Sequence, residues 1–309
     1  KEKLEGCRFD GIAGALQKYA EKIMKKWVEN AISHFGKHTI VFSGGLAMNI
    51  KINKIISEIS GVDNLFIAGG GGDESLSIGA AIFHSNQINP KISFQSPLHD
   101  YHGPEIDDQS LDKIMEKKEL SSEFNLKHTN NLEIAELLSQ NYVIGRCKGR
   151  SEFGPRSLGN RSILANPSKV DNLKKINEKI KFRDFWMPFT PSILIEQSEK
   201  YVINPKNILS PYMTIGFDST QKAKVDLVAA IHPADQTLRP QFVEKSTNPE
   251  YHDLISKFEA LTGIGGLLNT SLNLHGEPIV GNVDDAIHTL LNSDLDALVI
   301  NDYLISRKR

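Results

Sequence analysis

Cysteine is scarce in this sequence, and the two that occur lie far apart. The 309 residues include only Cys7 and Cys147, with no CxxC pair and no neighbouring cluster of His and Cys. This spacing argues against a disulfide framework and against a structural zinc site. It is typical of proteins that work in a reducing compartment, and we therefore expect a cytoplasmic location.

Long apolar runs and an excess of charge of either sign are also lacking. The chain has 36 Lys and Arg against 38 Asp and Glu, and no stretch reaches the length that spans a bilayer. The charged opening KEKLEG does not have the pattern of a signal peptide. We therefore expect neither a nucleic-acid partner nor a membrane partner. The first residue is Lys rather than Met, so we expect an N-terminal portion to be missing.

The first part of the chain predicts helices that alternate with short strands. Residues 11–35 space their apolar side chains as one face of an amphipathic helix does, at Ile12, Leu16, Tyr19, Ile23, Trp27 and Ile32. A strand from His38 turns at Gly44 and Gly45 into a helix over 46–59. A second strand, NLFIA, leads into four glycines and a third helix. Turns at the carboxyl ends of α/β strands are where such sheets usually bind ligands.

The second part follows a stretch over 86–108 that is rich in Asn, Pro and His, which we interpret as a linker. Beyond it the patterns predict helices at 111–118, 131–140, 169–180, 249–261 and 282–291. They predict strands at 142–147, 192–196, 212–217, 225–232, 265–271 and 297–305. Alternation of helices and strands indicates an α/β protein.

The segment 149–167, GRSEFGPRSLGNRSILANP, concentrates charge between glycines and prolines. It carries Arg150, Glu152, Arg156 and Arg161, and Lys148 precedes it. Glycine lets a backbone approach a ligand closely, and proline stiffens the loop. The planar donor fork of arginine suits phosphate and carboxylate oxygens. The segment predicts either a site for a polyanionic small molecule or a surface turn whose charges pair locally.

Two glycine turns in the first part are further candidates. Gly44 and Gly45 follow a strand, which suits a turn against a nucleotide but also tight packing of a helix on a strand. Asp73 follows the four glycines 69–72 at the start of a helix. Its carboxylate either caps that helix or holds a metal bound to phosphate oxygens.

Three polar stretches in the second part complete the candidates. KFRDFWMPFTP contains Lys181 and Arg183, and IHPADQTLRPQ contains His232 and Arg239. A lone histidine beside an apolar run is usually structural, so His232 has low weight. NTSLNLHGEPIV places amides and hydroxyls at the end of a buried strand, at Asn269, Thr270, Ser271 and Asn273. Such groups need partners, either within a hydrogen-bonded loop or on a ligand.

Four stretches together resemble one family, the NodU- and CmcH-type O-carbamoyltransferases. They are FSGGLAMN with GGGGDESLSIGAA, RSEFGPRSLGNRSILANP, RDFWMPFTPSIL with IHPADQTLRPQFV, and TGIGGLLNTSLNLHGEPIV. Their order and spacing cover nearly the whole chain. The resemblance implies an α/β fold in two domains. Residues 1–95 would be the C-terminal half of an actin/sugar-kinase-like (ASKHA) domain, and residues 96–309 a YrdC-like domain.

The resemblance also implies the chemistry. The YrdC-like domain would convert carbamoyl phosphate and ATP to carbamoyl adenylate. The kinase-like domain would pass the carbamoyl group to a hydroxyl of a small-molecule acceptor, near a divalent metal such as iron or magnesium. By position, the implied catalytic residues are Lys148, Arg150, Arg156 and Arg161, and the implied metal ligand is Asp73. The implied nucleotide-binding residues are Gly44, Gly45, Arg183, Arg239, Asn269, Ser271 and Asn273.

Two departures from the family pattern stand out. The N-terminal half of the family, with its HxxH metal pair, is absent, and His34 and His38 lie outside that context. Met187 stands where many relatives have an arginine. Two alternatives stay open: threonylcarbamoyladenylate-type synthesis for tRNA modification, and a nucleotide-binding module without turnover.

Overall fold

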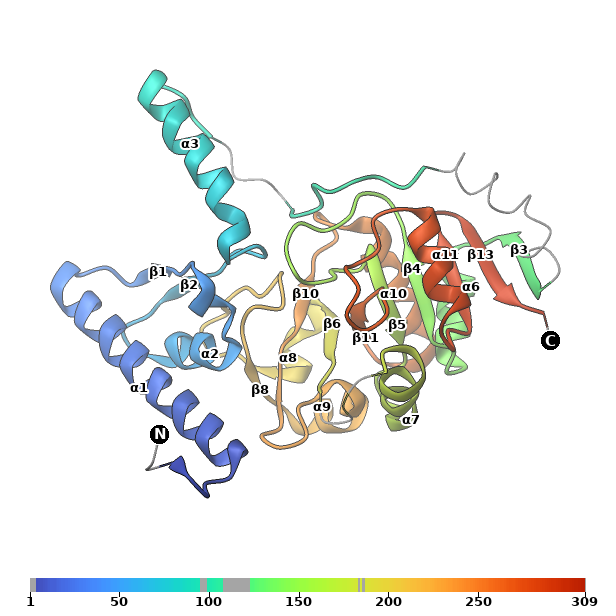
Figure 1. Ribbon diagram of the computed structural model, residues 1–309, viewed down its shortest axis with the longest axis horizontal. Helices are drawn as coiled ribbons and strands as arrows, with labels where there is room; N and C mark the ends of the chain where they lie inside the picture. The colour runs from blue at the N-terminus through green and yellow to red at the C-terminus, as the bar shows by residue number, and fades with distance from the viewer. Residues whose placement is uncertain (1–3, 95–98, 108–122, 183, 185–186, 309) are drawn as a thin grey trace.

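The computed structural model describes residues 4–94, 99–107, 123–182, 184 and 187–308. The helix expected at 111–118 and the candidate Arg183 lie outside the described residues. Within them, a first part built on a small parallel sheet is followed by a second part built on a large mixed sheet (Figure 1). The expected α/β class is therefore confirmed.

The first part alternates helices and strands as expected. Its elements are α1 (Phe9–Phe35), β1 (Thr39–Val41), η2 (Gly45–Met48), α2 (Ile50–Glu58), β2 (Asn64–Phe66), η3 (Asp73–Ser75) and α3 (Leu76–Ile88). Strands β1 and β2 pair in parallel, with Thr39 opposite Asn64. The side chain of Asn49 caps α2 by accepting the N–H of Ile52 at 3.1 Å. Both glycine-rich turns consequently lie at the same edge of this sheet.

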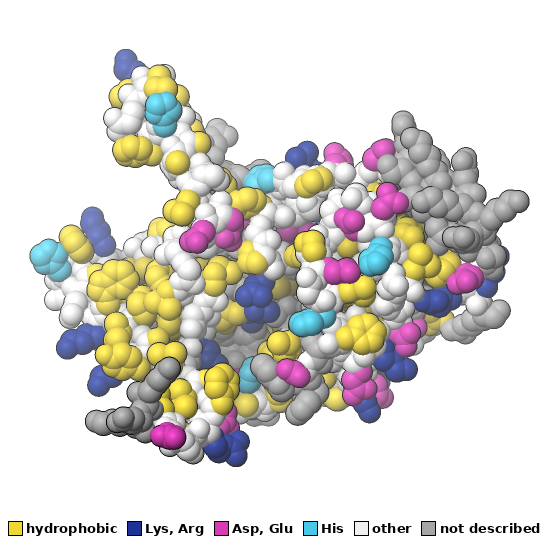
Figure 2. Space-filling model, viewed as in Figure 1, with side chains coloured by type: hydrophobic (Ala, Val, Ile, Leu, Met, Phe, Trp, Pro, Cys, Tyr) yellow, Lys and Arg dark blue, Asp and Glu magenta, His cyan; other side chains and the backbone are white. Residues whose placement is uncertain are grey.

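Most of the apolar face expected for α1 is exposed, although Ile32 packs against the core. Trp27 is 61% exposed, and Leu16 and Tyr19 are equally open, whereas Met24 and Val28 pack inward. The physical reason is that α1 rests on α2 along one side only, and no described residue covers the other. Helix α3 has no buried residue at all and stands away from the body in Figure 1. Figure 2 shows the resulting gathering of apolar side chains at this end.

The second part is organised by an eight-stranded sheet with the order β10-β6-β11-β5-β4-β12-β13-β3. These strands are β3 (Phe124–His128), β4 (Ile144–Cys147), β5 (Arg161–Ala165), β6 (Thr190–Leu194), β10 (Gln241–Val243), β11 (Gly266–Ser271), β12 (Ala297–Ile300) and β13 (Tyr303–Arg307). Strands β4 and β12 are parallel, whereas β4 and β5 are antiparallel. A small antiparallel sheet joins β7 (Val202–Ile203), β8 (Phe217–Ser219) and β9 (Thr237–Leu238).

Helices cover both faces of the large sheet, because its strands alternate apolar side chains between the faces. Ile144, Leu164 and Leu267 pack with α6 (Asn131–Ser139) and α10 (Pro249–Thr262) in one core. A second core joins the neighbouring strand residues to α11 (Val283–Leu291), α7 (Val170–Lys175) and its π-helical continuation η4 (Ile176–Ile180). Short helices complete this part: η5 (Ile195–Gln197), α8 (Ser198–Tyr201), α9 (Gln221–Asp226) and η6 (Val228–Ala230).

Several expected strands of the second part are wrong. Residues 225–232 are largely helical, in α9 and η6, because Thr220 caps α9 through the N–H of Ala223. Residues 212–217 are irregular up to the first residue of β8. The stretch expected as one strand over 297–305 is a hairpin, with a turn at Asn301 and Asp302 between β12 and β13. The expected loop 149–167 ends in a buried strand, β5.

The two parts are joined by buried polar contacts. The Asn53 side chain on α2 donates to the carbonyl of Thr214 at 2.7 Å. Lys206 donates to three carbonyls at the end of α2, those of Ser57, Ile59 and Val62, at 2.6–2.8 Å. A cation at a helix C-terminus satisfies carbonyls that the helix leaves open. No helix in the described ranges combines the length and apolar character needed to cross a bilayer.

Candidate functional site

The Gly/Arg loop, residues 148–160, connects β4 to β5, which pair so that Cys147 lies opposite Arg161. Glu152 lies inside this loop, and its Oε1 accepts three backbone N–H groups: those of Leu158 at 2.7 Å, Asn160 at 2.8 Å and Arg161 at 3.1 Å. Charge-assisted hydrogen bonds of this kind are stronger than neutral ones. The conformation of the loop is therefore fixed by hydrogen bonds to one of its own side chains, which distinguishes it from a solvated surface turn.

Arg161 is buried, and its guanidinium points back into the chain. It donates to four carbonyls at 2.9–3.1 Å: those of Pro104, Lys148, Gly149 and Asn160. Carbonyl oxygens have two lone pairs and tolerate such sharing. The side chain implied to cradle phosphates therefore braces the loop and the segment beside it.

Arg156 contrasts with Arg161. It is half-buried, and its Nε is shielded from solvent without an acceptor. Within the described part of the chain, no hydrogen bond or ion pair reaches its guanidinium. Desolvation by burial lowers the pKa of Arg156 from its ordinary value. An unpaired, partly desolvated cation is unfavourable unless an anion joins it, so this side chain is suited to bind one.

Lys148 and Arg150 lie at the rim of the Gly/Arg loop. The Lys148 ammonium pairs with Glu250 at 2.7 Å and with Asp302 at 2.8 Å. Arg150 is exposed and donates to the carbonyl of His102 at 3.0 Å. Both cations are near Arg156 in sequence, but Lys148 is already neutralised by carboxylates.

A buried polar network ties the loop to the sheet through Asn269. Ser157 donates to Oδ1 of Asn269 at 3.2 Å, and the amide of Asn269 donates to Ser192 at 2.9 Å. Ser192 in turn donates to Gln241 at 2.7 Å, and Gln241 donates to the carbonyl of Leu158 at 2.9 Å. This circuit joins β11, β6 and β10 to both sides of the loop. Asn269 therefore has its partners within the protein.

Ser271 and Asn273 are organised by Lys181, a residue that was noticed in the sequence but not assigned to the site. Its buried ammonium donates to the carbonyl and hydroxyl oxygens of Ser271 and to the carbonyl and side-chain oxygens of Asn273. Ser271 also donates to Oδ1 of Asn273 at 2.7 Å. The sequence signal for Lys181 was its position directly after the expected helix 169–180, in a turn rich in proline and aromatic residues. Nearby Met187 is half-buried.

Arg239 lines a cavity of about 220 Å³ between the two parts. Apolar Phe189 and Leu238 share its wall with Lys51 of α2 and His232. Thr190, also on the wall, donates to the carbonyl of Asn269 at 3.0 Å. Thr190 consequently connects the cavity wall to Asn269 and so to the network that holds the Gly/Arg loop.

An acidic group contacts two residues that line this cavity. Asp235 accepts from Lys51 at 2.5 Å and lies 3.2 Å from Nδ1 of His232. Burial alone would raise the pKa of Asp235, but the bonds from Lys51 and Thr237 outweigh it and lower the pKa to about 2. His232, given low weight from the sequence, therefore has a carboxylate partner.

The glycine turns of the first part meet each other and the loop. Gly44, with φ of 103°, donates its N–H to the carbonyl of Gly71 at 2.8 Å. Gly44 and Gly45 are exposed to solvent. A Cβ on Gly154 of the Gly/Arg loop would lie 2.8 Å from the carbonyl oxygen of Gly69. Glycine at 154 is thus required for close contact between the Gly/Arg loop and the backbone at Gly69.

Asp73 is exposed at the first residue of η3. In the described ranges, no group of three or more His, Cys, Asp or Glu side chains is arranged to hold a metal ion. The described residues therefore do not by themselves provide the ligands of the implied metal ion. As a ligand, Asp73 stays a prediction.

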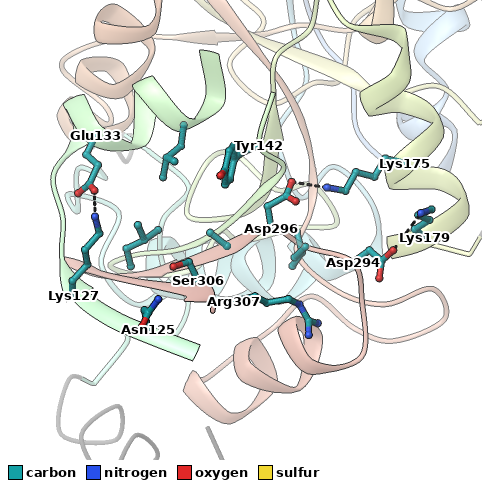
Figure 3. Close-up of a pocket in the computed structure, with 14 residues that line it drawn as sticks. Asn125, Lys127, Glu133, Tyr142, Lys175, Lys179, Asp294, Asp296, Ser306 and Arg307 are labelled. Carbon is teal, nitrogen blue, oxygen red and sulfur yellow. Dashed lines mark hydrogen bonds and ion pairs between the residues drawn. The ribbon is translucent and has the colours of Figure 1, made fainter. Parts of the chain in front are cut away.

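A second hollow lies elsewhere in the described part of the chain. It measures about 720 Å³ and is lined by Tyr142 and Asp296, which precede β4 and β12, whereas the Gly/Arg loop follows β4 (Figure 3). Its charges pair with one another, as in Lys175 with Asp296 at 2.5 Å and Lys127 with Glu133. None of the candidate residues lines it, so its size does not make it the site.

The comparison with solved structures gives weak likenesses. Full-length HypF in its phosphate- and nucleotide-bound form aligns with a TM-score of 0.42 and 16% identity, over 56% of this chain and 25% of that one. A variant of Sua5 from P. abyssi aligns with a TM-score of 0.36 and 11% identity, over 55% of this chain and 49% of that one. The strand order above therefore stands on its own.

Sequence comparison is more informative. An uncharacterised protein of Methanocaldococcus jannaschii is 38% identical over 96% of this chain and 56% of its own length. Nodulation protein NolO of Bradyrhizobium diazoefficiens is 33% identical over 96% and 54%. The 3'-hydroxymethylcephem-O-carbamoyltransferase of Amycolatopsis lactamdurans is 27% identical over 94% and 53%. The chain spans about half the length of these curated relatives.

Two family descriptions match along the chain. Residues 2–82 match the family described as Carbamoyltransferase N-terminus. Residues 135–307 match the family described as Carbamoyltransferase C-terminus, and these are more than half of the chain. The second match contains the Gly/Arg loop, Lys181 and the Asn269 network. The expected resemblance is confirmed, and the chain belongs to the carbamoyltransferase family.

Proposed function

We propose that this chain carries the adenylate-forming half of an O-carbamoyltransferase, which makes carbamoyl adenylate from carbamoyl phosphate and ATP. The observation that carries the proposal is Arg156, a half-buried guanidinium that has no hydrogen-bond or ion-pair partner among the described residues, on a loop braced by Glu152. An anionic substrate would supply the missing partner, and the planar fork of arginine matches phosphate and carboxylate oxygens.

The proposed reaction balances with one water. Water releases inorganic phosphate from carbamoyl phosphate and leaves carbamate. A carbamate oxygen then attacks the α-phosphorus of ATP, the bond to the bridging oxygen breaks, and pyrophosphate leaves. Negative charge on the phosphate oxygens is stabilised best by cations that are already in position. In this proposal Arg156, held in the braced loop, would be such a cation. Arg150 and Arg239 would contact the same or neighbouring phosphates.

The other candidate residues take supporting roles in this proposal. Arg161 braces the Gly/Arg loop, and Asn269 connects the loop to the sheet. Lys181 holds Ser271 and Asn273 together, which prepares their amide and hydroxyl groups for the nucleotide or the carbamoyl amide. Lys148 would require release from Glu250 or Asp302 before it could contact phosphate.

For the domains, we propose that residues 1–95 form the second half of an actin/sugar-kinase-like domain and residues 96–309 a YrdC-like domain. The separate sheets of the two parts and the two separate family matches support this division. Transfer of the carbamoyl group to a hydroxyl of a small molecule is proposed for the whole protein. The name of the Amycolatopsis relative, which specifies a hydroxymethyl acceptor, supports that class.

The experiment that tests the function measures pyrophosphate release by the purified chain with ATP, with and without carbamoyl phosphate. We expect release only with both substrates, and a loss of about 100-fold in Arg156→Ala because a positioned cation is removed from the transition state. Arg156→Lys should recover part of the rate, since it restores charge without the fork. Lys127→Ala, at the remote hollow, serves as the matched control and should keep the wild-type rate.

Other results would favour the alternatives. Release that requires threonine and bicarbonate in place of carbamoyl phosphate would indicate threonylcarbamoyladenylate synthesis. A folded chain that binds ATP but releases no pyrophosphate with either set of substrates would contradict adenylation by this chain and favour a nucleotide-binding module.

A further inference from the structure

We propose that Glu152 is the positioning residue of the site: its carboxylate shapes the Gly/Arg loop so that Arg156 is aimed at the anionic substrate. This inference rests on the proposed function, which assigns the anion to Arg156, and adds the residue that determines the geometry. Glu152 lies at one end of the segment 153–157, and the N–H groups that it accepts begin at Leu158 on the other end. The hydrogen bond from Leu158 to the Glu152 carboxylate therefore closes a ring of chain from 152 to 158, and Arg156 lies within that ring.

The three hydrogen bonds are specific to this geometry. Oε1 of Glu152 lies 2.7 Å from the nitrogen of Leu158, 2.8 Å from that of Asn160 and 3.1 Å from that of Arg161. The turn that points these groups inward requires Gly159, whose φ is 115° and whose added Cβ would lie 2.4 Å from the ring of Tyr251. Convergent N–H groups of this kind form a concave site for an anion. Here that site is filled by the chain's own carboxylate.

In the described ranges, Glu152 is hydrogen-bonded to the backbone and not to a basic side chain. Among the described residues it makes no ion pair with Arg146, Arg156 or any other basic side chain, and its Oε2 is buried without a donor. Its hydrogen bonds described above all come from backbone N–H groups, and its charge also acts electrostatically on the buried Arg146. Arg161 braces the same loop with the opposite charge, through carbonyls at Gly149 and Asn160. The Glu152 carboxylate thus accepts from N–H groups at the end of the loop, and the Arg161 guanidinium donates to its carbonyl groups.

The sign of the effect on anion binding separates positioning from simple electrostatics. A carboxylate near an anion site repels the ligand, so removal of its charge alone should tighten binding. If Glu152 positions Arg156, its removal should weaken binding instead, because the loop relaxes and the guanidinium loses its aim. The two roles predict changes in opposite directions.

The experiment measures the dissociation constants of ATP and of inorganic pyrophosphate by calorimetry for the wild-type chain and three variants. We expect Glu152→Ala to weaken binding of both by about tenfold or more, because three charge-assisted hydrogen bonds are lost. Glu152→Gln keeps an oxygen acceptor in the same place and should recover much of the affinity. Glu250→Gln removes a nearby charge without removing a backbone hydrogen bond, and should leave affinity equal or slightly higher.

Hydrogen exchange of the peptide that spans 153–163 provides a second readout that needs no ligand. Glu152→Ala should lose protection at Leu158, Asn160 and Arg161, while peptides from α10 stay protected. Unchanged protection, or tighter anion binding in Glu152→Ala, would overturn the role of Glu152. If the wild-type chain binds neither anion, the proposed function fails, and the exchange result still decides whether Glu152 holds the loop.

Discussion

Two arginines that are close in sequence, Arg156 and Arg161, have different surroundings in the structure. Arg161 is surrounded by four carbonyl acceptors, whereas the guanidinium of Arg156 has no protein partner in the described ranges. The difference follows from direction, since Arg161 belongs to a buried strand and Arg156 to the turn before it. From the sequence, both arginines were expected to contact the substrate. In the structure, only Arg161 has its guanidinium occupied by protein acceptors among the described residues.

Replacement of Arg161 by methionine should reduce the free energy of unfolding by roughly 3 kcal/mol or more. The buried carbonyls of Gly149 and Asn160, with two others, would lose their donor, and unsatisfied buried groups are unfavourable. Urea unfolding would measure the change. Arg150→Met removes a single bond on the surface and should change stability by about 0.5 kcal/mol or less. Equal effects in the two variants would contradict the bracing role.

At the scale of elements, the cavity beside Arg239 is formed where α2 meets the segment around β9. Lys51 on α2 pairs with Asp235, and Asp235 also holds the turn of Thr237 through its N–H at 3.1 Å. Lys206 and Asn53 fasten the two ends of the same helix to the second part. Helix α2 is therefore the element that positions the two parts relative to each other.

Asp235 should make this junction sensitive to acid. Its pKa in the folded chain is lowered from the ordinary 3.8 to about 2, so the ionised carboxylate stabilises the fold above pH 4. This contribution fades as pH falls from about 4 to about 2. Because the ion pair is partly exposed, we expect only about 1 kcal/mol. Asp235→Asn should lose that amount at pH 7 and flatten the dependence of stability on pH in this window.

Urea unfolding at pH 7, pH 4 and pH 2.5 measures the effect. Asp63→Asn, on the exposed surface before β2, is the matched control and should reproduce the wild-type profile. A wild-type profile in Asp235→Asn would show that the junction does not depend on this carboxylate.

At the scale of the whole molecule, apolar side chains accumulate on the first part. The exposed residues include Phe83 and Leu76 on α3, Trp27 and Leu16 on α1, and Val41 on β1. Exposed apolar side chains that accumulate in one region of a protein favour association. The second part has two covered sheet faces and shows no comparable accumulation among its described residues.

Phe83→Ser should therefore reduce self-association of the purified chain and leave its unfolding midpoint unchanged, because Phe83 makes little contact with the rest of the fold. Sedimentation velocity and thermal unfolding would measure the two quantities. Val28→Ser changes a buried residue of α1 and should instead destabilise the chain by about 2 kcal/mol. Self-association that persists in Phe83→Ser would exclude α3 as its surface.

The elements predicted well are those whose signals are local. The helices at α1, α6, α10 and α11 have strong periodicity and identifiable caps, such as the reciprocal capping box of Asn282 and Asp285. The strands expected at 212–217 and 225–232 failed because short apolar runs suit a strand, a helix or an irregular buried segment equally well. Strand β5 was hidden by the glycines and arginines before it, although RSILA is buried throughout.

The sequence by itself determined the family and the α/β class and indicated the Gly/Arg loop as a candidate site, because glycine, proline and arginine at fixed spacing carry local chemistry. Tertiary structure decided which of those groups is available. The partners that occupy Arg161, Lys148 and Asn269 come from distant segments or from backbone atoms, which no local pattern specifies. Arg156 differs from its neighbours only in the fold, which gives Arg161 and Lys148 partners and leaves the Arg156 guanidinium with none among the residues that the structure describes.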